Sequence, residues 1–346
     1  MKARKAEFLT GQTISVNPTV LQKKVKPLLA TLYLPLFLVF ILVSPASAKE
    51  EFVRIASGLA GTYPIMGAKA AELINKYIPG VKASTIMRGA TEGCLRVNKG
   101  EAEMSIDYSF DSKQLFDGTG ASGIKAPNLR HLMTLYGSVY QPISVTKAGV
   151  TKLSQLKEKP YRVWGASKGS VFYQLCVAAL QAHGLTYDDV KKAGGVMEAF
   201  DYGQTIEAIQ DGRLDVSFYA GPVPYQVLQQ VAKNPGFSLI GFDNDSIAKM
   251  QQLLPGTGKT IVKAGSYPGQ TEDKLLPYLV NEWQIGAHVS DELAYQITKV
   301  LVEHYKDFHG LFAGSQEIGP DVLLTHYAIP VHPGAVRYYK EIGKMK

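Results

Sequence analysis

The sequence predicts an α/β protein made of two related lobes, each built on mostly parallel sheet and joined to the other by a hinge. Three observations predict this class. Strand-like and helix-like segments alternate along the chain, which is typical of parallel sheets. A pattern of glycines, charges and apolar runs occurs twice, about 110 residues apart. The chain of 346 residues is long enough for two domains, and its 46% apolar residues are ordinary for a globular protein.

The repeat consists of two pairs of similar segments. "VRIASGLAGTYPIMGAKAAEL", from residue 53, aligns with "YRVWGASKGSVFYQLCVAALQ", from residue 161. "VNKGEAEMSIDY", from residue 97, aligns with "IQDGRLDVSFYA", from residue 209. The matched positions include Arg54 with Arg162, Gly61 with Gly169, Gly100 with Gly212, and Glu103 with Asp215. Two lobes with the same opening explain both matches. Coincidence is the alternative, because helix–glycine–strand junctions are common in α/β proteins.

The first lobe begins with a strand at 53–56 and a helix at 63–77. Thr62 is a suitable N-cap, and Pro64 is tolerated in a first turn, where its missing N–H costs nothing. The helical spacing predicts a buried face made of Met66, Ala70, Leu73 and Tyr77. A strand at 82–87, the polar loop "RGATEG", a short helix and a strand within "AEMSIDYS" complete the series.

The segment "HLMTLYGSVYQPISVTK", 131–147, is long enough to run from one lobe into the other. We therefore assign residues 143–238 to the second lobe, and residues 49–142 plus 239–346 to the first. "FSLIGF", 237–242, is the predicted return segment. His332, with Pro333 and Gly334, is predicted to begin a C-terminal helix that anchors the first lobe.

Residues 1–48 predict a secretory signal peptide that is removed after Ala48. A basic region ending at Lys26 precedes the apolar run "LLATLYLPLFLVFILV" and the small-residue site "ASA". An uncleaved membrane anchor is the alternative, because the apolar run is almost long enough to span a bilayer. We therefore expect a periplasmic protein.

The net charge of +7 does not predict a nucleic-acid-binding protein. Six basic residues and one acidic residue lie in the first 48, and the remaining 31 basic and 29 acidic residues give +2. No basic patch with interleaved aromatic residues remains. Cys94 and Cys176 could pair in an oxidising compartment, but they fall in different predicted lobes, so two buried thiols are expected instead.

Two glycine-bearing loops, 58–63 and 165–170, each connect a strand to a helix. Parallel sheets place their ligand sites at this edge, where helix N-termini present unpaired N–H groups to an anion. Glycine lets a ligand approach the main chain closely. The loops therefore predict the two halves of a site for a small acid. Tight turns without a ligand are the alternative.

Along the whole stretch after residue 48, the sequence resembles the TAXI-type substrate-binding proteins of TRAP transporters. The segments that carry the resemblance are "GLAGTYPIMGAKAAELINK", "GASKGSVFYQLCVAAL", "DGRLDVSFYAGPVPYQVLQQ" and, most specifically, "VHPGAVRYYKEIG". The resemblance implies a two-lobed periplasmic-binding-protein fold of type II, closing on a small organic acid such as glutamate or a related dicarboxylate. It also implies delivery of that acid to the membrane permease subunits of a TRAP transporter. The chain departs from the family pattern at Pro64, Val171 and Cys94.

Ten residues are candidates for ligand contact. They are Gly61, Thr62, Tyr63, Arg88, Thr91 and Asp107 in the first lobe, and Ser167, Ser170, Tyr219 and Gly221 in the second. The hydroxyls could instead cap helices, Arg88 could be solvated, Asp107 could cap the next helix, and Tyr63 could pack between the lobes. Tyr136, Trp164 and Phe218 are predicted to be core residues.

Two other functions remain open. "GASKG" matches the Gly-x-Ser-x-Gly elbow of serine hydrolases, with Ser167 as the nucleophile. The matching first-lobe loop has Leu59 at that place, which indicates that the turn does not depend on a nucleophile. An exported sensor without transport is the second possibility. The seven histidines show no metal-ligand spacing, so we expect no metal. For a two-lobed solute receptor we also expect no cofactor and no enzymatic activity.

Overall fold

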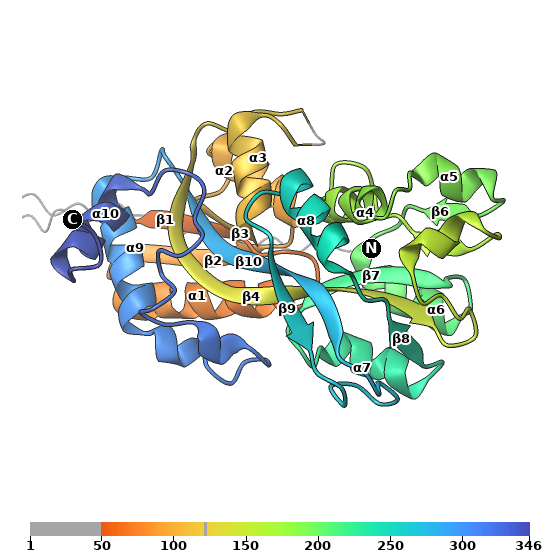
Figure 1. Cartoon of the computed structure of the whole chain (residues 1–346). Coiled ribbons are helices and arrows are strands. Elements are labelled where there is room, and N and C mark those ends of the chain that lie inside the picture. Colours follow the sequence, from red (N-terminus) through yellow and green to blue (C-terminus); the bar gives the residue numbers. More distant parts are fainter. Residues whose placement is uncertain (1–49, 121–122) are drawn as a thin grey trace, which may run out of the picture. The chain divides into compact units, whose positions relative to one another are not determined.

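A computed structural model of the chain describes residues 50–120 and 123–346 (Figure 1). The predicted signal peptide lies outside the described residues. In the described part of the chain, no helix combines the length and apolar character needed to cross a bilayer. The first lobe opens with β1 (Glu51–Ala56), α1 (Tyr63–Tyr77), β2 (Val81–Ile86), α2 (Ala90–Asn98), β3 (Met104–Tyr108) and α3 (Ser109–Asp117).

A long strand, β4 (Leu129–Val145), leads into the second lobe. There the chain forms β5 (Arg162–Trp164), α4 (Val171–Ala182), α5 (Tyr187–Lys192), β6 (Val196–Glu198), α6 (Thr205–Gln210), β7 (Val216–Gly221), α7 (Gln226–Lys233) and β8 (Phe237–Leu239). The remaining elements are α8 (Asn244–Leu253), β9 (Gly258–Val262), β10 (Lys274–Gly286), α9 (Asp291–Glu303) and α10 (Pro333–Glu341).

The strand order shows the same arrangement twice. The order is β2-β1-β3-β10-β4-β7-β5-β6, so each lobe has a second-first-third strand series followed by a strand that crosses from the other lobe. Within each series the pairings are parallel, whereas β4 and β10 pair antiparallel with each other and with β7 and β3. This topology confirms the predicted two-lobed α/β fold of the type II binding-protein kind.

Two neighbouring strands connect the lobes, as the middle of Figure 1 shows. The first, β4, begins in the first-lobe sheet and reaches β7 from Val139 to Ser144, so the predicted crossing segment is confirmed. The return runs through β10 and not through 237–242. In fact β8 pairs with β4 at Ile143–Val145, and Phe242, Ile247 and Met250 pack into the second-lobe core. The predicted return was placed too early, because "FSLIGF" is a strand of the second sheet.

The first helix follows its sequence pattern. It spans the predicted residues, with Pro64 in its first turn and Met66, Ala70 and Leu73 buried. Tyr77 is 38% exposed and stacks on His304, so it does not belong to the buried face as predicted. At the other end of the lobe, His332 accepts a hydrogen bond from the N–H of Gly334 and caps α10, as the sequence predicts. Cys94 and Cys176 are both free and buried.

The aligned charges of the repeat form the same ion pair in both lobes. Arg54 contacts both carboxylate oxygens of Glu103 and donates to the carbonyl of Gly100. Arg162 contacts both carboxylate oxygens of Asp215 and donates to the carbonyl of Gly212. In each case the arginine's own main-chain N–H also donates to that carboxylate. Such agreement in detail favours a shared origin of the lobes over coincidence.

The Arg162–Asp215 ion pair should make the stability of the protein depend on pH in a defined direction. Partial burial favours the neutral acid at Asp215, but the hydrogen bonds from Arg162 outweigh it, so the pKa of Asp215 lies below its ordinary value. A lowered pKa contributes stability above the unfolded pKa, about 3.9, and that contribution is lost as pH falls through the folded value. Asp215→Asn should lower the free energy of unfolding at pH 7 by about 1 kcal/mol.

The difference in the free energy of unfolding between variant and parent should shrink below about pH 4. Urea unfolding of both proteins between pH 3 and pH 7 measures it. Asp211→Asn, at an exposed acid nearby, is the control and should change little. A pH-independent difference for Asp215→Asn would contradict the ion-pair explanation.

Candidate functional site

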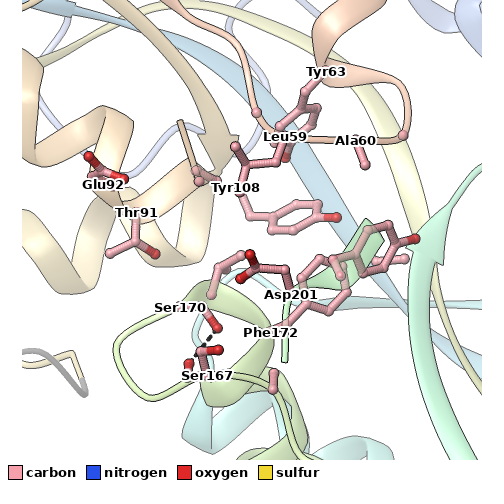
Figure 2. Close-up of a pocket in the computed structure, with 18 of the residues that line it drawn as sticks. Leu59, Ala60, Tyr63, Thr91, Glu92, Tyr108, Ser167, Ser170, Phe172 and Asp201 are labelled. Carbon is pink, nitrogen blue, oxygen red and sulfur yellow. Dashed lines mark hydrogen bonds between the residues drawn. The ribbon is translucent and has the colours of Figure 1, made fainter. Parts of the chain in front are cut away.

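A cavity of about 320 Å³ lies between the two lobes. Residues of both lobes line it (Figure 2). In each lobe these residues lie near the carboxyl ends of the three parallel strands or in the segments that follow them. The first lobe contributes residues 58–63 after β1, 89–92 after β2, and Tyr108 at the end of β3. The second contributes Trp164 and residues 166–172 after β5, 200–202 after β6, and Ala220 at the end of β7, with Tyr225 beyond it. This is the edge at which parallel sheets bind ligands.

Three helix N-termini open into the cavity. They belong to α1, α2 and α4, whose first residues are among those that line it. Neither N-cap residue of α1 or α2, Thr62 and Gly89, accepts a hydrogen bond through a side chain. Only α4 is capped this way, because Ser170 accepts from the N–H of Tyr173. Pro64 has no N–H, but the other first-turn N–H groups of α1 and those of α2 receive no side-chain cap from these residues and are available to an acceptor from outside the chain.

Aromatic side chains form the second-lobe wall of the cavity. The ring of Phe172 stacks on Tyr202 with centroids 4.6 Å apart, and Trp164 lies 5.4 Å from Phe172. Tyr202 donates a hydrogen bond to the hydroxyl of Tyr225. On the first-lobe side, Tyr108 projects between the loop at Leu59–Tyr63 and the segment that bears Asp201, as Figure 2 shows. The cavity therefore combines polar helix ends with an apolar wall.

Charged side chains lie at the rim of the cavity. Glu92, Lys168 and Asp201 are the charged residues among the described lining, and all three are exposed. Glu92 is balanced by Arg88 at 3.2 Å and Arg96 at 3.0 Å. The interior of the cavity, in the part of the chain that the structure describes, has no ionised side chain opposite the helix ends.

Six of the ten predicted residues line the cavity: Gly61, Thr62, Tyr63, Thr91, Ser167 and Ser170. Their side chains, however, mostly bond within the protein. The hydroxyl of Thr62 pairs with that of Tyr136 at 2.6 Å, and the hydroxyl of Tyr63 donates to Asn281 at 2.9 Å. Ser170 caps α4 and donates to the carbonyl of Ser167. The main chain, more than these hydroxyls, is what this part of the site presents to a ligand.

The other four predicted residues, Arg88, Asp107, Tyr219 and Gly221, do not line the cavity. Arg88 turns to Glu92, and the ring of Tyr225 lies beside Gly221. Tyr219 is buried against Tyr202. Asp107 is fully buried and accepts from the N–H of Tyr108 at 2.7 Å, so its side chain faces the protein core. In each case a sequence neighbour lines the cavity instead. For Asp107 and Tyr219 the reason is that alternate residues of a strand point to opposite faces.

A buried polar network joins the cavity to both lobes. Thr91 lines the cavity and donates to Asp111 on α3 at 2.8 Å. Asp111 also accepts from Gln174, which lies on α4 in the second lobe. Burial, and then the nearby charge of Asp111, raises the pKa of Asp107 well above its ordinary value, which favours the neutral form of this acid. The Asp111–Gln174 hydrogen bond therefore links the two lobes directly.

Most of the aromatic wall is not among the residues predicted from the sequence. Trp164 was assigned to the core, and although it is buried it also lines the cavity. Four further lining residues were not predicted: Phe172, Phe200, Asp201 and Tyr202. The signal was available in the repeat: the loop after the second strand, "RGAT" in the first lobe, corresponds to "FDYG" after β6 in the second. Phe218 is a core residue, as predicted.

Neither a metal site nor a hydrolase triad is assembled here. Across residues 50–120 and 123–346, no three His, Cys, Asp or Glu side chains gather in a way that could hold a metal ion. Ser167 lines the cavity, but the described lining includes no histidine to act as its base. The hydrolase alternative therefore gains no support from the geometry.

Comparison with known proteins finds a matching family and several similar solved structures. Residues 55–343 match the model of the NMT1-like family. The alkanesulfonate-binding protein SsuA from Xanthomonas axonopodis pv. citri, bound to MOPS, is similar with 14% identity and a TM-score of 0.48, covering 85% of this chain and 94% of its own. PhnD1 from Prochlorococcus marinus, in complex with methylphosphonate, is similar with 11% identity and a TM-score of 0.48, covering 86% and 100%.

Proposed function

We propose that this chain, which belongs to the NMT1-like family, is an extracytoplasmic solute receptor that binds a small organic acid between its two lobes. The observation that carries the proposal is the cavity with three helix N-termini, two of which have no side-chain cap. Aligned backbone dipoles place about half a positive charge at each helix N-terminus. A carboxylate would satisfy the free N–H groups that the protein itself leaves available.

Both lobes are needed for this site. The N-termini of α1 and α2 belong to the first lobe, and that of α4 belongs to the second. A ligand that contacts all three favours the closed arrangement by the difference between its affinities for the closed and open states. Hinge movement at β4 and β10 would then open the cavity for entry and release.

The resemblance to TAXI-type proteins supports a transport role. It makes the permease subunits of a TRAP transporter the expected partner and the periplasm the expected location, in agreement with the signal peptide that residues 1–48 predict. It also offers glutamate or a related dicarboxylate as a first ligand to test. A sensor with the same fold would bind the ligand without a permease.

Ligand screening tests the receptor function directly. A panel of carboxylates should contain at least one member that raises the thermal unfolding midpoint. At 100-fold its Kd, a ligand adds about 2.7 kcal/mol to the free energy of unfolding. The same acid should reduce the radius of gyration measured by small-angle scattering. A panel without any stabilising acid, or a stabilising acid without any change in scattering, would count against a closing receptor.

A further inference from the structure

The cavity offers one site for an anionic group, and its remaining surface suits an apolar body. The free N–H groups of α1 and α2 belong to the first lobe. The second-lobe wall beyond the N-terminus of α4 is made of Trp164, Phe172 and Tyr202 in mutual ring contact. These two surfaces border one cavity, so a single ligand can meet both.

A second carboxylate has a less favourable place inside, because the remaining helix N-terminus, that of α4, is already capped by Ser170, which accepts from the N–H of Tyr173. Aromatic rings carry negative charge on their faces, which disfavours an anion against them. A carboxylate removed from water without a partner is costly. Lys168 is the cation among the described lining residues, but it is exposed and lies at the rim, where Asp201 is also exposed. No arginine lines the described cavity to hold a second carboxylate by a bidentate pair.

The cavity is also small. Its volume of about 320 Å³ is near the lower end of the range for ligand sites, about 300–1,000 Å³. A single ring or a short branched chain with one acidic group fits that volume.

We infer that the ligand is a monocarboxylate with an aromatic or branched aliphatic body, and not a dicarboxylate. The carboxylate accepts from the N-termini of α1 and α2, and the body packs against Phe172 and its neighbours. This inference rests on the proposed function, because it assumes that the cavity binds an acid. It differs from the glutamate or dicarboxylate that the family resemblance offers.

Calorimetry on the purified chain tests the inference with matched probes: phenylacetate, indole-3-acetate and 4-methylpentanoate as monoacids, succinate and glutamate as acids with two carboxylates, and 2-phenylethanol as a neutral analogue. At least one monoacid should bind ten-fold or more tightly than succinate and glutamate, and 2-phenylethanol should bind much more weakly than phenylacetate.

The outcomes separate the two proposals. Succinate or glutamate binding as tightly as the best monoacid overturns the inference and leaves the receptor proposal standing. Binding of 2-phenylethanol as tightly as phenylacetate, or binding of no acid at all, overturns both.

A variant pair locates the body of the ligand. Phe172→Ser removes one ring of the wall and should weaken binding of the best monoacid about ten-fold or more. Tyr173→Ser alters the next residue of α4, which does not line this cavity, and should leave the affinity unchanged. Thermal unfolding shows whether each variant is folded. Equal losses in both variants, or no loss in a folded Phe172→Ser protein, would overturn the placement of the apolar body at this wall.

Discussion

Gln174→Leu is expected to weaken ligand binding about ten- to a hundred-fold while leaving each lobe folded. Gln174 and Asp111 are both buried, and their hydrogen bond joins α4 of the second lobe to α3 of the first. In the open state both groups would be hydrated, so the bond contributes to the closed state alone. A hydrogen bond to a charged group contributes about 1.5–3 kcal/mol, which corresponds to this range of affinity. Ligand affinity falls by the same factor, because binding requires closure.

Calorimetry with the tightest acid from the screen measures the effect, and scattering reports whether the saturated variant still closes. Gln181→Leu is the matched control, since Gln181 is an exposed glutamine on the same helix. It should bind as the parent does. If Gln174→Leu also keeps the parent affinity, the Asp111–Gln174 bond does not hold the lobes together.

Gly61→Ala is expected to weaken binding ten-fold or more by a different mechanism. Gly61 has a φ of +76°, and a Cβ built there would lie 2.7 Å from the hydroxyl of Tyr225 in the other lobe. Tyr225 is only 4% exposed, and its hydroxyl accepts from Tyr202, so it cannot easily move away. The methyl group would therefore oppose closure. The left-handed conformation itself costs alanine a further 1–2 kcal/mol or so.

Two further variants separate the clash from the backbone strain. Adding Tyr225→Phe removes the hydroxyl and leaves the ring carbon 4.0 Å from the new Cβ, so the double variant should recover part of the lost affinity. Gly184→Ala places alanine at a φ of +72° with no atom within 4 Å, and should lower stability without a specific loss of binding. Absence of any recovery in the double variant would show that the contact between Gly61 and Tyr225 does not limit closure.

Local chemistry explains which elements could be predicted. Helix α1 was predicted at its observed bounds because Pro64, the apolar spacing and the glycine loop all indicate the same start and face. The crossing strand β4 was predicted from a long, mainly apolar segment that could run from one lobe into the other. The return through β10 was not, because 237–242 and 274–286 are both strand-like, and only their pairing partners distinguish them.

The candidate site likewise has features that local sequence indicates and features that depend on distant contacts. The sequence indicated the glycine loops and the helix N-termini, since glycine, serine and threonine at strand–helix junctions have local effects. It could not show that the hydroxyls of Thr62 and Tyr63 bond to Tyr136 and Asn281, because those partners lie 74 and 218 residues away. Asp107 was predicted to contact the ligand, but its neighbour Tyr108 lines the cavity instead. A shift of one residue along a strand reverses the face to which the side chain points.

The sequence by itself determined the two-lobed α/β class, the repeat and the loops that form the cavity, because these depend on periodicity and on local backbone preference. Only the tertiary structure decided where the chain returns between the lobes, which helix ends lack a side-chain cap, and which aromatic rings face the cavity. It also decided that Asp111 meets Gln174 across the lobes. Each of these depends on contacts between residues far apart in the chain, and local sequence preference does not specify such contacts.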